Sequence, residues 1–419
     1  MVAVPFPFAG AVDDVPPAGP APRPGLLARI RARRATRWDD AIDATLSARE
    51  RVDLRARWAE AAGRTGLGRT TSTPLGGVAL GGLPVVEHVD PGAYGRPGYL
   101  IVRLRPGQLL ADLEDRAAEL AAGLGCWGVR FRPVTGDHVR VDLLDGDPLA
   151  RTVHHATVTG RHDALVFGVD ETGAVVARTL DELTHIAIQG SNGAGKSAAA
   201  YSLLGQVPQL RAFGPLVDVV GIDPTGLLLG PWGDHPRGWR VSGTADAADR
   251  YTAVLRALVD DMDDRIANLP PRCDRMPISG ATPLRLVVLE ELPGISRNTG
   301  YKASGAPSEV QRLIARIAAE GRKAGYRLLV IGQRLGSDVL ATDVRDQLLT
   351  RLTFGCRDLA TLRMLSPDAT PEDLAPLAAS PPGVALADMP GLPMTRVRAP
   401  WVGDYGGYCD LVAGGSAAA

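Results

Sequence analysis

The fold is decided by one stretch, Gly190-Ser191-Asn192-Gly193-Ala194-Gly195-Lys196-Ser197, which matches the pattern GxxxxGK[ST]. An apolar run, THIAIQ (184–189), precedes it, and helix-forming residues, AAAYSLLGQV (198–207), follow it. In this context the glycines let backbone N–H groups surround a β-phosphate, the lysine reaches the β- and γ-phosphates, and the hydroxyl binds Mg²⁺. The stretch predicts a P-loop that binds ATP through Gly190 to Ser197, with Lys196 as a catalytic group and Ser197 as a ligand of Mg²⁺.

Lysine is rare in this chain, which makes Lys196 informative. Of the 46 Lys and Arg residues only three are lysines, Lys196, Lys302 and Lys323. Arginine is bulkier and planar, so it is a poor substitute for a P-loop lysine. The composition bias therefore supports a chemical requirement for Lys196, whereas chance retention is the better explanation for the other two.

Two further apolar runs end in residues that suit ATP hydrolysis. LVVLEE (286–291) ends in Glu290 and Glu291, and YRLLVIGQ (326–333) ends in Gln333. In P-loop ATPases with a catalytic glutamate, the first acid holds the water shell of Mg²⁺ and the second polarises the attacking water. We therefore assign Glu290 to the metal, Glu291 to the water, and Gln333 to a hydrogen bond with the γ-phosphate or that water. A solvated acid pair at a strand end is the alternative explanation.

Strands and helices alternate around these motifs. Apolar runs lie at LTHIAIQG (183–190), LVDVVGID (216–223), LRLVVLEE (284–291) and YRLLVIGQ (326–333), with helical patterns at 245–269 and 310–324 between them. β-branched strands separated by helices predict an α/β fold with a mainly parallel sheet that is covered on both faces. Ligands bind such folds at the carboxyl ends of the strands, where all three motifs lie.

Composition and periodicity divide the chain into six segments. Residues 1–25 are rich in Pro, Ala and Gly and predict a disordered tail, residues 26–68 have a helical pattern, and residues 69–84 predict a linker. Residues 85–150 predict a small α+β domain of βαββ order, with one apolar and one charged face to its sheet. The α/β domain follows over residues 151–405, and residues 406–419 predict a flexible tail.

Composition also excludes several classes of protein. The chain has 419 residues, 45% hydrophobic and 22% charged, which is ordinary for globular domains and excludes global disorder. Its net charge of −1 means that any contact with nucleic acid must be local. Four widely spaced cysteines form no zinc pattern and favour a reduced, cytoplasmic location. No apolar run is long enough to span a membrane.

Four segments resemble, in order, the motor of FtsK/SpoIIIE-type DNA translocases, which belong to the HerA/FtsK superfamily of P-loop ATPases. They are SNGAGKS (191–197), VVLEEL (287–292), GRKAGYRLLVIGQR (321–334) and VRDQLLTRLTFGC (344–356). The resemblance covers about Pro84 to Val402. In its short form the chain is most similar to the plasmid-transfer (Tra-like) branch of high-GC Gram-positive bacteria.

The resemblance implies a RecA-like P-loop NTPase fold and an ATPase that couples hydrolysis to movement along double-stranded DNA. It also implies a ring, usually a homo-hexamer, with ATP at the subunit boundaries and duplex DNA in the channel. The setting would be conjugative transfer of a plasmid or an integrative element. The sequence predicts no transmembrane segment in the chain. A membrane or transfer-machinery protein would therefore localise it.

Two groups of residues take candidate roles from the resemblance. An arginine from the neighbouring subunit would stabilise the transferring phosphate, and three arginines in matching segments qualify: Arg322, Arg345 and Arg351. Ordinary salt bridges are the alternative for each of them. The polar loop after the acid pair supplies the candidates for DNA binding: Arg297, Tyr301 and Lys302. A plain surface loop is the alternative there.

Three positions depart from the family pattern. Thr225 stands where lysine is usual, Gly332 where threonine is usual, and Glu290 where aspartate is more frequent, whereas His185 is retained. Each departure argues for slower hydrolysis. Two other functions therefore stay open: an FtsK-like ATPase of a protein secretion system, and a nucleotide-dependent assembly or regulatory protein with weak hydrolysis.

Overall fold

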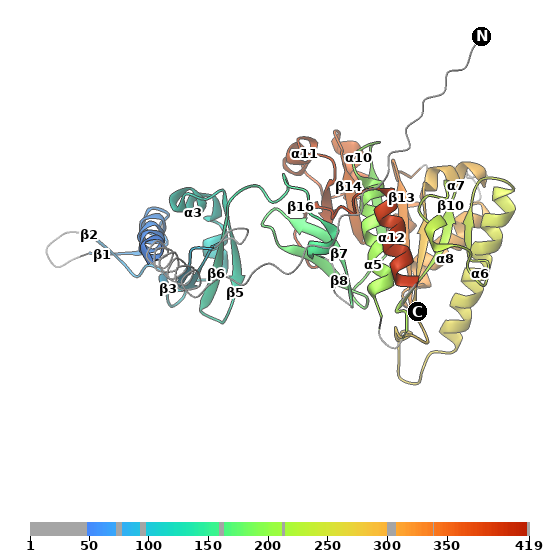
Figure 1. Cartoon of the computed structure of the whole chain (residues 1–419), viewed down its shortest axis with the longest axis horizontal. Coiled ribbons are helices and arrows are strands. Elements are labelled where there is room, and N and C mark those ends of the chain that lie inside the picture. Colours follow the sequence, from blue (N-terminus) through green and yellow to red (C-terminus); the bar gives the residue numbers. More distant parts are fainter. Residues whose placement is uncertain are drawn as a thin grey trace, which may run out of the picture.

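The computed structural model describes residues 48–72, 78–92, 98–158, 163–211, 214–299, 307–337 and 339–416. Within these ranges the chain forms a small domain and a large domain, seen at the left and right of Figure 1. The predicted disordered tail, residues 1–25, and the first part of the predicted helical segment, residues 26–47, lie outside the described ranges.

The small domain is a four-stranded antiparallel sheet with helices on one face. Its strands are β3 (Val85–Asp90), β4 (Tyr99–Arg103), β5 (Gly128–Pro133) and β6 (His138–Leu144), in the order β3-β4-β6-β5. Helices α2 (Leu110–Glu114) and α3 (Ala117–Leu124) lie between β4 and β5. The predicted βαββ order is therefore extended by β3, whose mixed sequence VVEHVD lacks a clear alternation of apolar and polar residues.

The helix over residues 48–64 completes the core of the small domain. The side chain of Trp58 is 1% exposed, and its Nε1 donates a hydrogen bond to the carbonyl oxygen of Pro84 at 3.0 Å. Trp58 shares one core cluster with Leu113 and Leu120 of the two sheet-covering helices. The predicted helix that carries Leu54 and Trp58 is present, and burial of its tryptophan makes it part of this domain.

The predicted linker over residues 69–84 differs from the structure. It contains a hairpin in which β1 (Arg69–Ser72) pairs antiparallel with β2 (Val78–Gly81). The β-branched residues Thr70, Thr71 and Val78 favour an extended backbone. The high glycine content of the segment hid this signal in the sequence.

The large domain is built on a ten-stranded sheet in the order β11-β10-β12-β13-β9-β14-β15-β16-β7-β8. All strand pairs from β11 to β14 are parallel, and the rest are antiparallel. The strands are β7 (Ala164–Asp170), β8 (Val175–Thr179), β9 (Ile186–Gly190), β10 (Val217–Asp223), β11 (Arg240–Ser242), β12 (Leu284–Leu289), β13 (Tyr326–Gly332), β14 (Thr350–Phe354), β15 (Val384–Asp388) and β16 (Thr395–Arg398). The predicted mainly parallel sheet is confirmed.

Helices cover both faces of this sheet. They are α4 (His155–Val158), α5 (Lys196–Gln206), α6 (Ala247–Ala267), α7 (Leu292–Asn298), α8 (Glu309–Glu320), α9 (Thr342–Gln347), α10 (Leu359–Arg363), α11 (Pro371–Ala378) and α12 (Tyr405–Ser416). Residues of α5 and α12 pack on one face, and residues of α6, α7, α8 and α9 pack on the other. Within the described residues no helix has both the length and the apolar character that a bilayer span needs.

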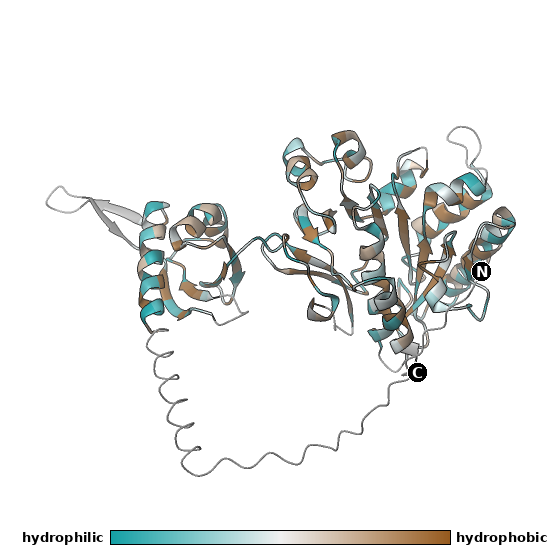
Figure 2. Cartoon of the chain, turned by 45° about the horizontal axis from the view of Figure 1, so that its top comes forward, coloured by the Kyte–Doolittle hydropathy of each residue, from teal (hydrophilic) through white to brown (hydrophobic). Residues whose placement is uncertain are grey.

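The central strands β9, β12 and β13 are mostly apolar and buried along their whole length, because both faces of the sheet are covered there. In β9, for example, Ile186 and Ile188 belong to one core cluster and Ala187 to the other. Figure 2 shows the result as hydrophobic strands in the centre of the large domain and hydrophilic residues on the outer surfaces of its helices. This packing brings the carboxyl ends of the parallel strands to one edge.

The carboxyl-terminal segment is the clearest difference from the sequence prediction. The sequence predicts a flexible tail over residues 406–419, but α12 occupies 405–416 and packs against α5. Tyr408 is fully buried: its hydroxyl donates to the carbonyl oxygen of Leu228 at 2.6 Å and accepts from Nε1 of Trp232 at 2.8 Å. The helix contains four glycines, Gly406, Gly407, Gly414 and Gly415, so its helicity depends on this tertiary packing rather than on intrinsic propensity.

Replacing Tyr408 by phenylalanine tests this anchor. Tyr408→Phe leaves the Leu228 carbonyl and the Trp232 indole without their partner, so we expect the free energy of unfolding to fall by about 1–3 kcal/mol in urea titrations. Tyr405→Phe on the same helix is the control, since Tyr405 is 39% exposed, and it should change stability by less than about 0.5 kcal/mol. Equal effects of the two substitutions would contradict the anchoring role.

Candidate functional site

The P-loop connects β9 to α5 at the carboxyl edge of the sheet. Gly190, Gly193 and Gly195 have φ angles of 151°, 74° and 106°. A Cβ atom on Gly190 would lie 2.2 Å from the carbonyl oxygen of Phe354, and one on Gly195 would lie 2.6 Å from the backbone nitrogen of Gly383. Glycine is therefore required by close backbone approach as well as by φ, and the turn brings the amino end of α5 to the edge where an anion can meet its N–H groups.

Lys196 and Ser197 begin α5 and line a cavity of about 250 Å³. The Nζ atom of Lys196 donates a hydrogen bond to the carbonyl oxygen of Ser191 at 2.9 Å. Burial lowers the pKa of Lys196, while the nearby carboxylates of Glu291 and Glu290 act in the opposite direction. The cavity is lined by Asn192, Lys196, Ser197, Ala200, Tyr201, Thr225, Leu227, Leu228, Glu290, Glu291, Ile331 and Gln333. The predicted P-loop, acid pair and glutamine thus meet at one cavity.

The acid pair follows β12 and includes a strained residue. Glu291 has a φ of 47°, in the left-handed region, and its carbonyl oxygen accepts hydrogen bonds from the N–H groups of Gly294 and Ile295 at the start of α7. Such a conformation costs a non-glycine residue about 1–3 kcal/mol and is concentrated at functional sites. This turn at the end of β12 places both Glu290 and Glu291 in the lining of the cavity.

Glu290 is held in an environment that disfavours its negative charge. Burial, together with the charges of Asp223 and Glu291, raises the pKa of Glu290 to about 7. Its Oε2 atom is buried and has no hydrogen-bond partner among the described residues. A cation beside this oxygen would favour the charged carboxylate.

The residues present fit a Mg²⁺ ion that arrives with a nucleotide. Mg²⁺ in phosphate sites is held by one or two protein ligands plus phosphate oxygens and water. Ser197 and the unpartnered Oε2 of Glu290 supply such a donor set. Across the described ranges no group of three or more metal-ligating side chains exists, so the phosphates would have to complete the coordination.

Gln333 follows β13 and is exposed where it lines the cavity. The preceding Gly332 sits in a tight space: a Cβ atom there would lie 2.9 Å from Cδ2 of Leu335 and 3.0 Å from Cδ of Pro293. Leu335 and Pro293 therefore pack against the strand end and occupy the space that the side chain of the usual threonine would need.

Asp223 organises the loop that faces the P-loop. Its buried carboxylate accepts hydrogen bonds from the backbone N–H groups of Thr225, Gly226, Leu228 and Leu229, and from the Thr225 hydroxyl at 2.7 Å. Thr225, which stands where lysine is usual, thus stabilises a turn instead of reaching a phosphate. The carboxylate of Asp223 is occupied by the hydrogen bonds of this turn. It affects the site through its negative charge, which helps to raise the pKa of Glu290.

Tyr201 is a cavity residue that the motifs did not reveal. Its ring stacks on the buried ring of Tyr408 in α12, with the centroids 4.7 Å apart and the planes 17° from parallel. One signal was present in the sequence, because Tyr201 lies four residues after Ser197 and therefore on the same face of the helix. The role of α12 in supporting it was visible only in three dimensions.

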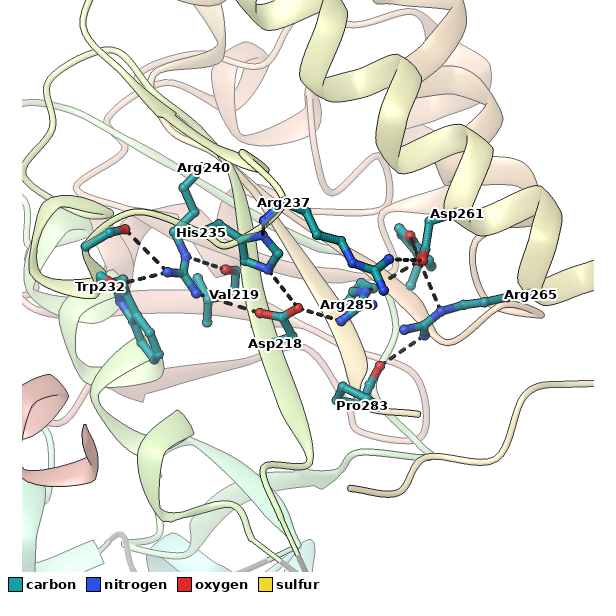
Figure 3. A network of polar contacts seen from close by, with 12 residues as sticks. Asp218, Val219, Trp232, His235, Arg237, Arg240, Asp261, Arg265, Pro283 and Arg285 are labelled. Carbon is teal, nitrogen blue, oxygen red and sulfur yellow. Dashed lines mark hydrogen bonds and ion pairs between the residues drawn. The ribbon is translucent and has the colours of Figure 1, made fainter. Parts of the chain in front are cut away.

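The amino edge of the sheet carries a network of arginines and aspartates (Figure 3). Asp218 pairs with Arg285 at 2.5 Å and with Arg240 at 3.7 Å, while Asp261 pairs with Arg265 at 3.1 Å and with Arg285 at 3.5 Å. These side chains come from β10, β11, β12 and α6, so the network ties the strand starts to a covering helix. The arginines shown there are paired within the chain.

Arg322 lies on the same edge in a different environment. It follows α8, is exposed, and makes no side-chain hydrogen bond or ion pair with the described residues. It borders a cavity of about 450 Å³ that is also lined by three cations, Arg275, Lys323 and Arg327, and by one carboxylate, Asp274. Arg327 is 2% exposed, and burial lowers its pKa to about 10. This cavity therefore gathers positive charge on the side of the sheet opposite the P-loop.

The other two candidate arginines are bound to their own chain. Arg345 donates to the carbonyl oxygen of Met364 and to the hydroxyl of Thr342, both at 2.9 Å. Arg351 pairs with Asp388 at 3.2 Å. The structure therefore distinguishes Arg322 from Arg345 and Arg351 by its lack of intramolecular partners.

His185 also lies at the amino edge, where it is buried and hydrogen bonded to the backbone. It is 5% exposed, and burial lowers its pKa to about 4, so the imidazole is neutral at physiological pH. Its Nδ1 accepts from the N–H of Leu328 at 2.8 Å, and its Nε2 donates to the carbonyl oxygen of Ala318 at 3.0 Å. The histidine thus connects the start of β9 to β13 and α8.

The candidate DNA-binding residues are only partly described. Arg297 is exposed near the end of α7, outside the lining of the cavity beside the P-loop. Tyr301 and Lys302 lie in 300–306, outside the described residues. The structure thus places Arg297 on a surface after the acid pair.

Known proteins are similar to this chain in sequence and in fold. The chain is 28% identical to Transfer protein TraSA of Streptomyces ambofaciens over 323 residues, 72% of this chain and 75% of that protein. It is 26% identical to DNA translocase FtsK of Corynebacterium glutamicum over 287 residues, 63% of this chain and 31% of that protein. Among solved structures, ATPases 2 and 3 of EssC from Geobacillus thermodenitrificans align with a TM-score of 0.50 at 15% identity, covering 64% of this chain and 51% of that one.

The fold of the large domain is that of P-loop ATPases. The relatives confirm the resemblance to FtsK-type DNA translocases and to transfer proteins. The match spans about a third of the FtsK relative's length, so it concerns one part of that protein. No family model matches the chain.

The raised pKa of Glu290 predicts an unusual dependence of stability on pH. The pKa of this carboxyl is 4.5 in the unfolded chain and about 7 in the folded chain. Between these pH values the folded chain holds a proton that the unfolded chain has lost, so the free energy of unfolding of the nucleotide-free protein should fall as pH rises from about 4.5 to about 7. Glu290→Gln should remove this fall and raise the free energy of unfolding at pH 8 by about 1–3 kcal/mol.

Urea titrations at pH 5 and pH 8 without Mg²⁺ measure this difference. Glu114→Gln is the matched control, because Glu114 is exposed on α2 in the small domain. If the free energy of unfolding changed equally with pH in the wild-type and Glu290→Gln proteins, Glu290 would have an ordinary pKa.

Proposed function

We propose that this chain is an ATP-driven translocase of double-stranded DNA that works as a ring, usually a homo-hexamer, in conjugative transfer of a plasmid or an integrative element. The observation that carries the proposal is that Lys196, Ser197, Glu290, Glu291 and Gln333 line one cavity. The relative named as a transfer protein, which aligns over 75% of its length, supports the transfer role.

The roles follow from the positions of the residues. Lys196 binds the β- and γ-phosphates beside the P-loop N–H groups, and Ser197 and Glu290 hold Mg²⁺. The ion, when bound, neutralises charge on the phosphates. Glu291 accepts a proton from the attacking water, and Gln333 hydrogen bonds that water or the γ-phosphate. The pKa of Glu290 near 7 means that binding of the ion displaces a proton from a partly protonated carboxyl.

A second subunit completes the site in this proposal. Arg322 is the arginine that reaches the neighbour's γ-phosphate, because it is exposed beside a positively charged cavity and has no partner among the described residues. Arg345 is hydrogen bonded to Met364 and Thr342 of its own chain. Arg351 is paired with Asp388 of its own chain. Both arginines therefore stabilise the fold of their own subunit. The two opposite edges of the sheet then meet between adjacent subunits of the ring.

The DNA would be held by phosphate contacts that carry no sequence information. Arg297 and the neighbouring Tyr301 and Lys302 remain the proposed contacts. A cytoplasmic protein of this kind needs a membrane or transfer-machinery partner to localise it at the site of transfer.

ATP turnover with linear double-stranded DNA tests the proposal. We expect DNA to stimulate turnover, Lys196→Ala to reduce it by about 10²-fold or more because phosphate stabilisation is lost, and Glu291→Gln to reduce it by about 10²–10⁴-fold because the base is lost. Glu114→Gln, an exposed acid of the small domain, should leave turnover unchanged.

The outcomes separate the competing functions. Turnover that ignores DNA but responds to a peptide substrate would favour a protein-secretion ATPase. Nucleotide binding without turnover would favour an assembly or regulatory protein, for which Thr225 in place of lysine is the supporting observation.

Mixing two inactive variants tests the arginine from the neighbour. Arg322→Ala should lower turnover about 10³-fold or more while leaving ATP binding intact, since an arginine supplied in trans contributes that much. Mixing it with Lys196→Ala should restore part of the turnover, because a subunit with an intact P-loop then meets a neighbour with an intact Arg322. Arg345→Ala and Arg351→Ala are the comparison variants.

The control mixture combines Lys196→Ala with Glu291→Gln. Both changes lie in the same cavity, so no restoration is expected there. Turnover that stays absent in the Arg322→Ala and Lys196→Ala mixture, although the variants assemble together, would show that Arg322 does not act between subunits.

A further inference from the structure

The helices of the small domain cover one face of its sheet, and the opposite face is rich in arginine. Val139 and Val141 of β6 belong to the core cluster that contains the helices. Side chains alternate along a strand, so Arg140 lies on the opposite face, where Arg132 and Arg130 of β5 join it. We refer to the surface formed by Arg130, Arg132 and Arg140 as the arginine face.

One buried carboxylate fixes the three guanidinium groups of the arginine face. Asp142 is fully buried, and its carboxylate accepts a hydrogen bond from Nε of each arginine. The distances are 3.0, 2.8 and 2.7 Å for Arg130, Arg132 and Arg140. The side chains of Arg132 and Arg140 are 49% and 34% exposed, and a guanidinium carries five N–H donors. Two fixed cations therefore present further donors at the surface.

The turn after β4 adds two buried donors that lack an acceptor. Nε of Arg105 and Nε2 of Gln108 are buried, and neither has a hydrogen-bond partner among the described residues. The two residues lie together, because the N–H of Gln108 donates to the carbonyl oxygen of Arg105 at 3.0 Å and the N–H of Arg105 donates to Oε1 of Gln108 at 3.3 Å. Unsatisfied buried donors cost free energy, which an acceptor from outside the chain would recover.

This turn and the arginine face are adjacent along the strands. The N–H of Leu104 donates to the carbonyl oxygen of Asp137 at 2.7 Å, which places the turn beside the loop between β5 and β6. Arg103, at the end of β4, pairs in register with His138 of β6. Arg140 follows His138 by two residues, a distance of about 7 Å along the same face of the strand.

Positive charge exceeds negative charge on this combined surface. The two exposed acids beside it have cationic partners of their own. Glu87 pairs with Arg103 at 3.1 Å and lies 2.9 Å from Nε2 of His138, and Asp137 lies 2.7 Å from Nδ1 of the same imidazole. Hydrogen bonds from Glu87 and Asp137 raise the pKa of His138. The excess positive charge therefore remains on the arginine face and on the turn.

We infer that the arginine face and the turn over residues 105–108 bind the phosphates of duplex DNA. This inference rests on the proposed function, which supplies the DNA, and it adds a contact surface in the small domain. Phosphate oxygens accept pairs of hydrogen bonds from the forked donors of arginine. They would also satisfy the free donors of Arg105 and Gln108. Contacts to phosphates carry no base sequence, which suits a translocase that must hold every stretch of DNA in turn.

The salt dependence of duplex binding by the full chain tests this inference. Arg105→Gln and Arg132→Gln each remove one phosphate contact, so each should weaken binding of a fluorescent linear duplex about fivefold to tenfold near about 0.1 M salt. Each should also lower the slope of log K against log salt concentration by about 1, and the double variant by about 2. Arg132→Lys keeps the charge and should retain most of the slope.

Two features of the chain make the comparison specific. Arg105 makes no side-chain hydrogen bond or ion pair with the described residues, so Arg105→Gln removes a charge without breaking a contact. Arg64→Gln is the matched control, because the side chain of Arg64 is 80% exposed on the helix over residues 48–64 and is paired with Glu60 at 2.6 Å. Neither the affinity nor the salt slope should change in that variant.

The failures of the two proposals are distinguishable. Duplex binding with equal affinity and equal salt slope in the wild type, Arg105→Gln and Arg132→Gln overturns this inference and leaves the proposed function standing. Unchanged duplex binding with loss of binding to polyglutamate would assign the surface to an acidic protein and also overturns it. A wild-type chain that neither binds duplex nor responds to it in ATP turnover overturns the proposed function and this inference together.

Discussion

The structure depends on the close backbone packing of the P-loop. The loop can follow this path only because positions 190 and 195 are glycines, since a Cβ atom would clash with the Phe354 carbonyl at Gly190 and with the backbone of Gly383 at Gly195. The N–H of Gly383 also donates to the carbonyl oxygen of Ala194 at 2.8 Å. These contacts bind the P-loop to β14 and to the start of β15. The position of Lys196 and the direction of α5 follow from them.

The two edges of the sheet differ in how their buried charged groups are paired. At the amino edge, Arg240, Arg265 and Arg285 are paired with Asp218 and Asp261 in a network that ties strands to α6. At the carboxyl edge, Glu290 is left partly buried without a hydrogen-bond partner. A buried polar atom without a partner costs free energy in the isolated chain. A bound cation and nucleotide would remove that cost, which couples stability of the site to occupancy.

The sequence predicted the central architecture correctly because the signals there are local. The apolar β-branched strands, the P-loop glycines and the strand-end residues Glu290, Glu291 and Gln333 each have a pattern that needs no knowledge of distant residues. The small-domain strand β3 and the helix α12 were missed because neither has such a pattern. Burial of Tyr408 against α5 makes α12 a helix, and Tyr201 enters the cavity on the surface that α12 supports.

The sequence by itself determined that the chain has a P-loop on a parallel sheet and which residue types stand at the strand ends, because glycine geometry and strand periodicity are properties of short segments. Only the tertiary structure decided which of three arginines lacks a partner, that Thr225 anchors a turn to Asp223, and that the backbone of Trp401 pairs with Val153 and His155. These facts depend on contacts between residues far apart in the chain. The energy of such contacts comes from burial and paired polar groups, which no local pattern records.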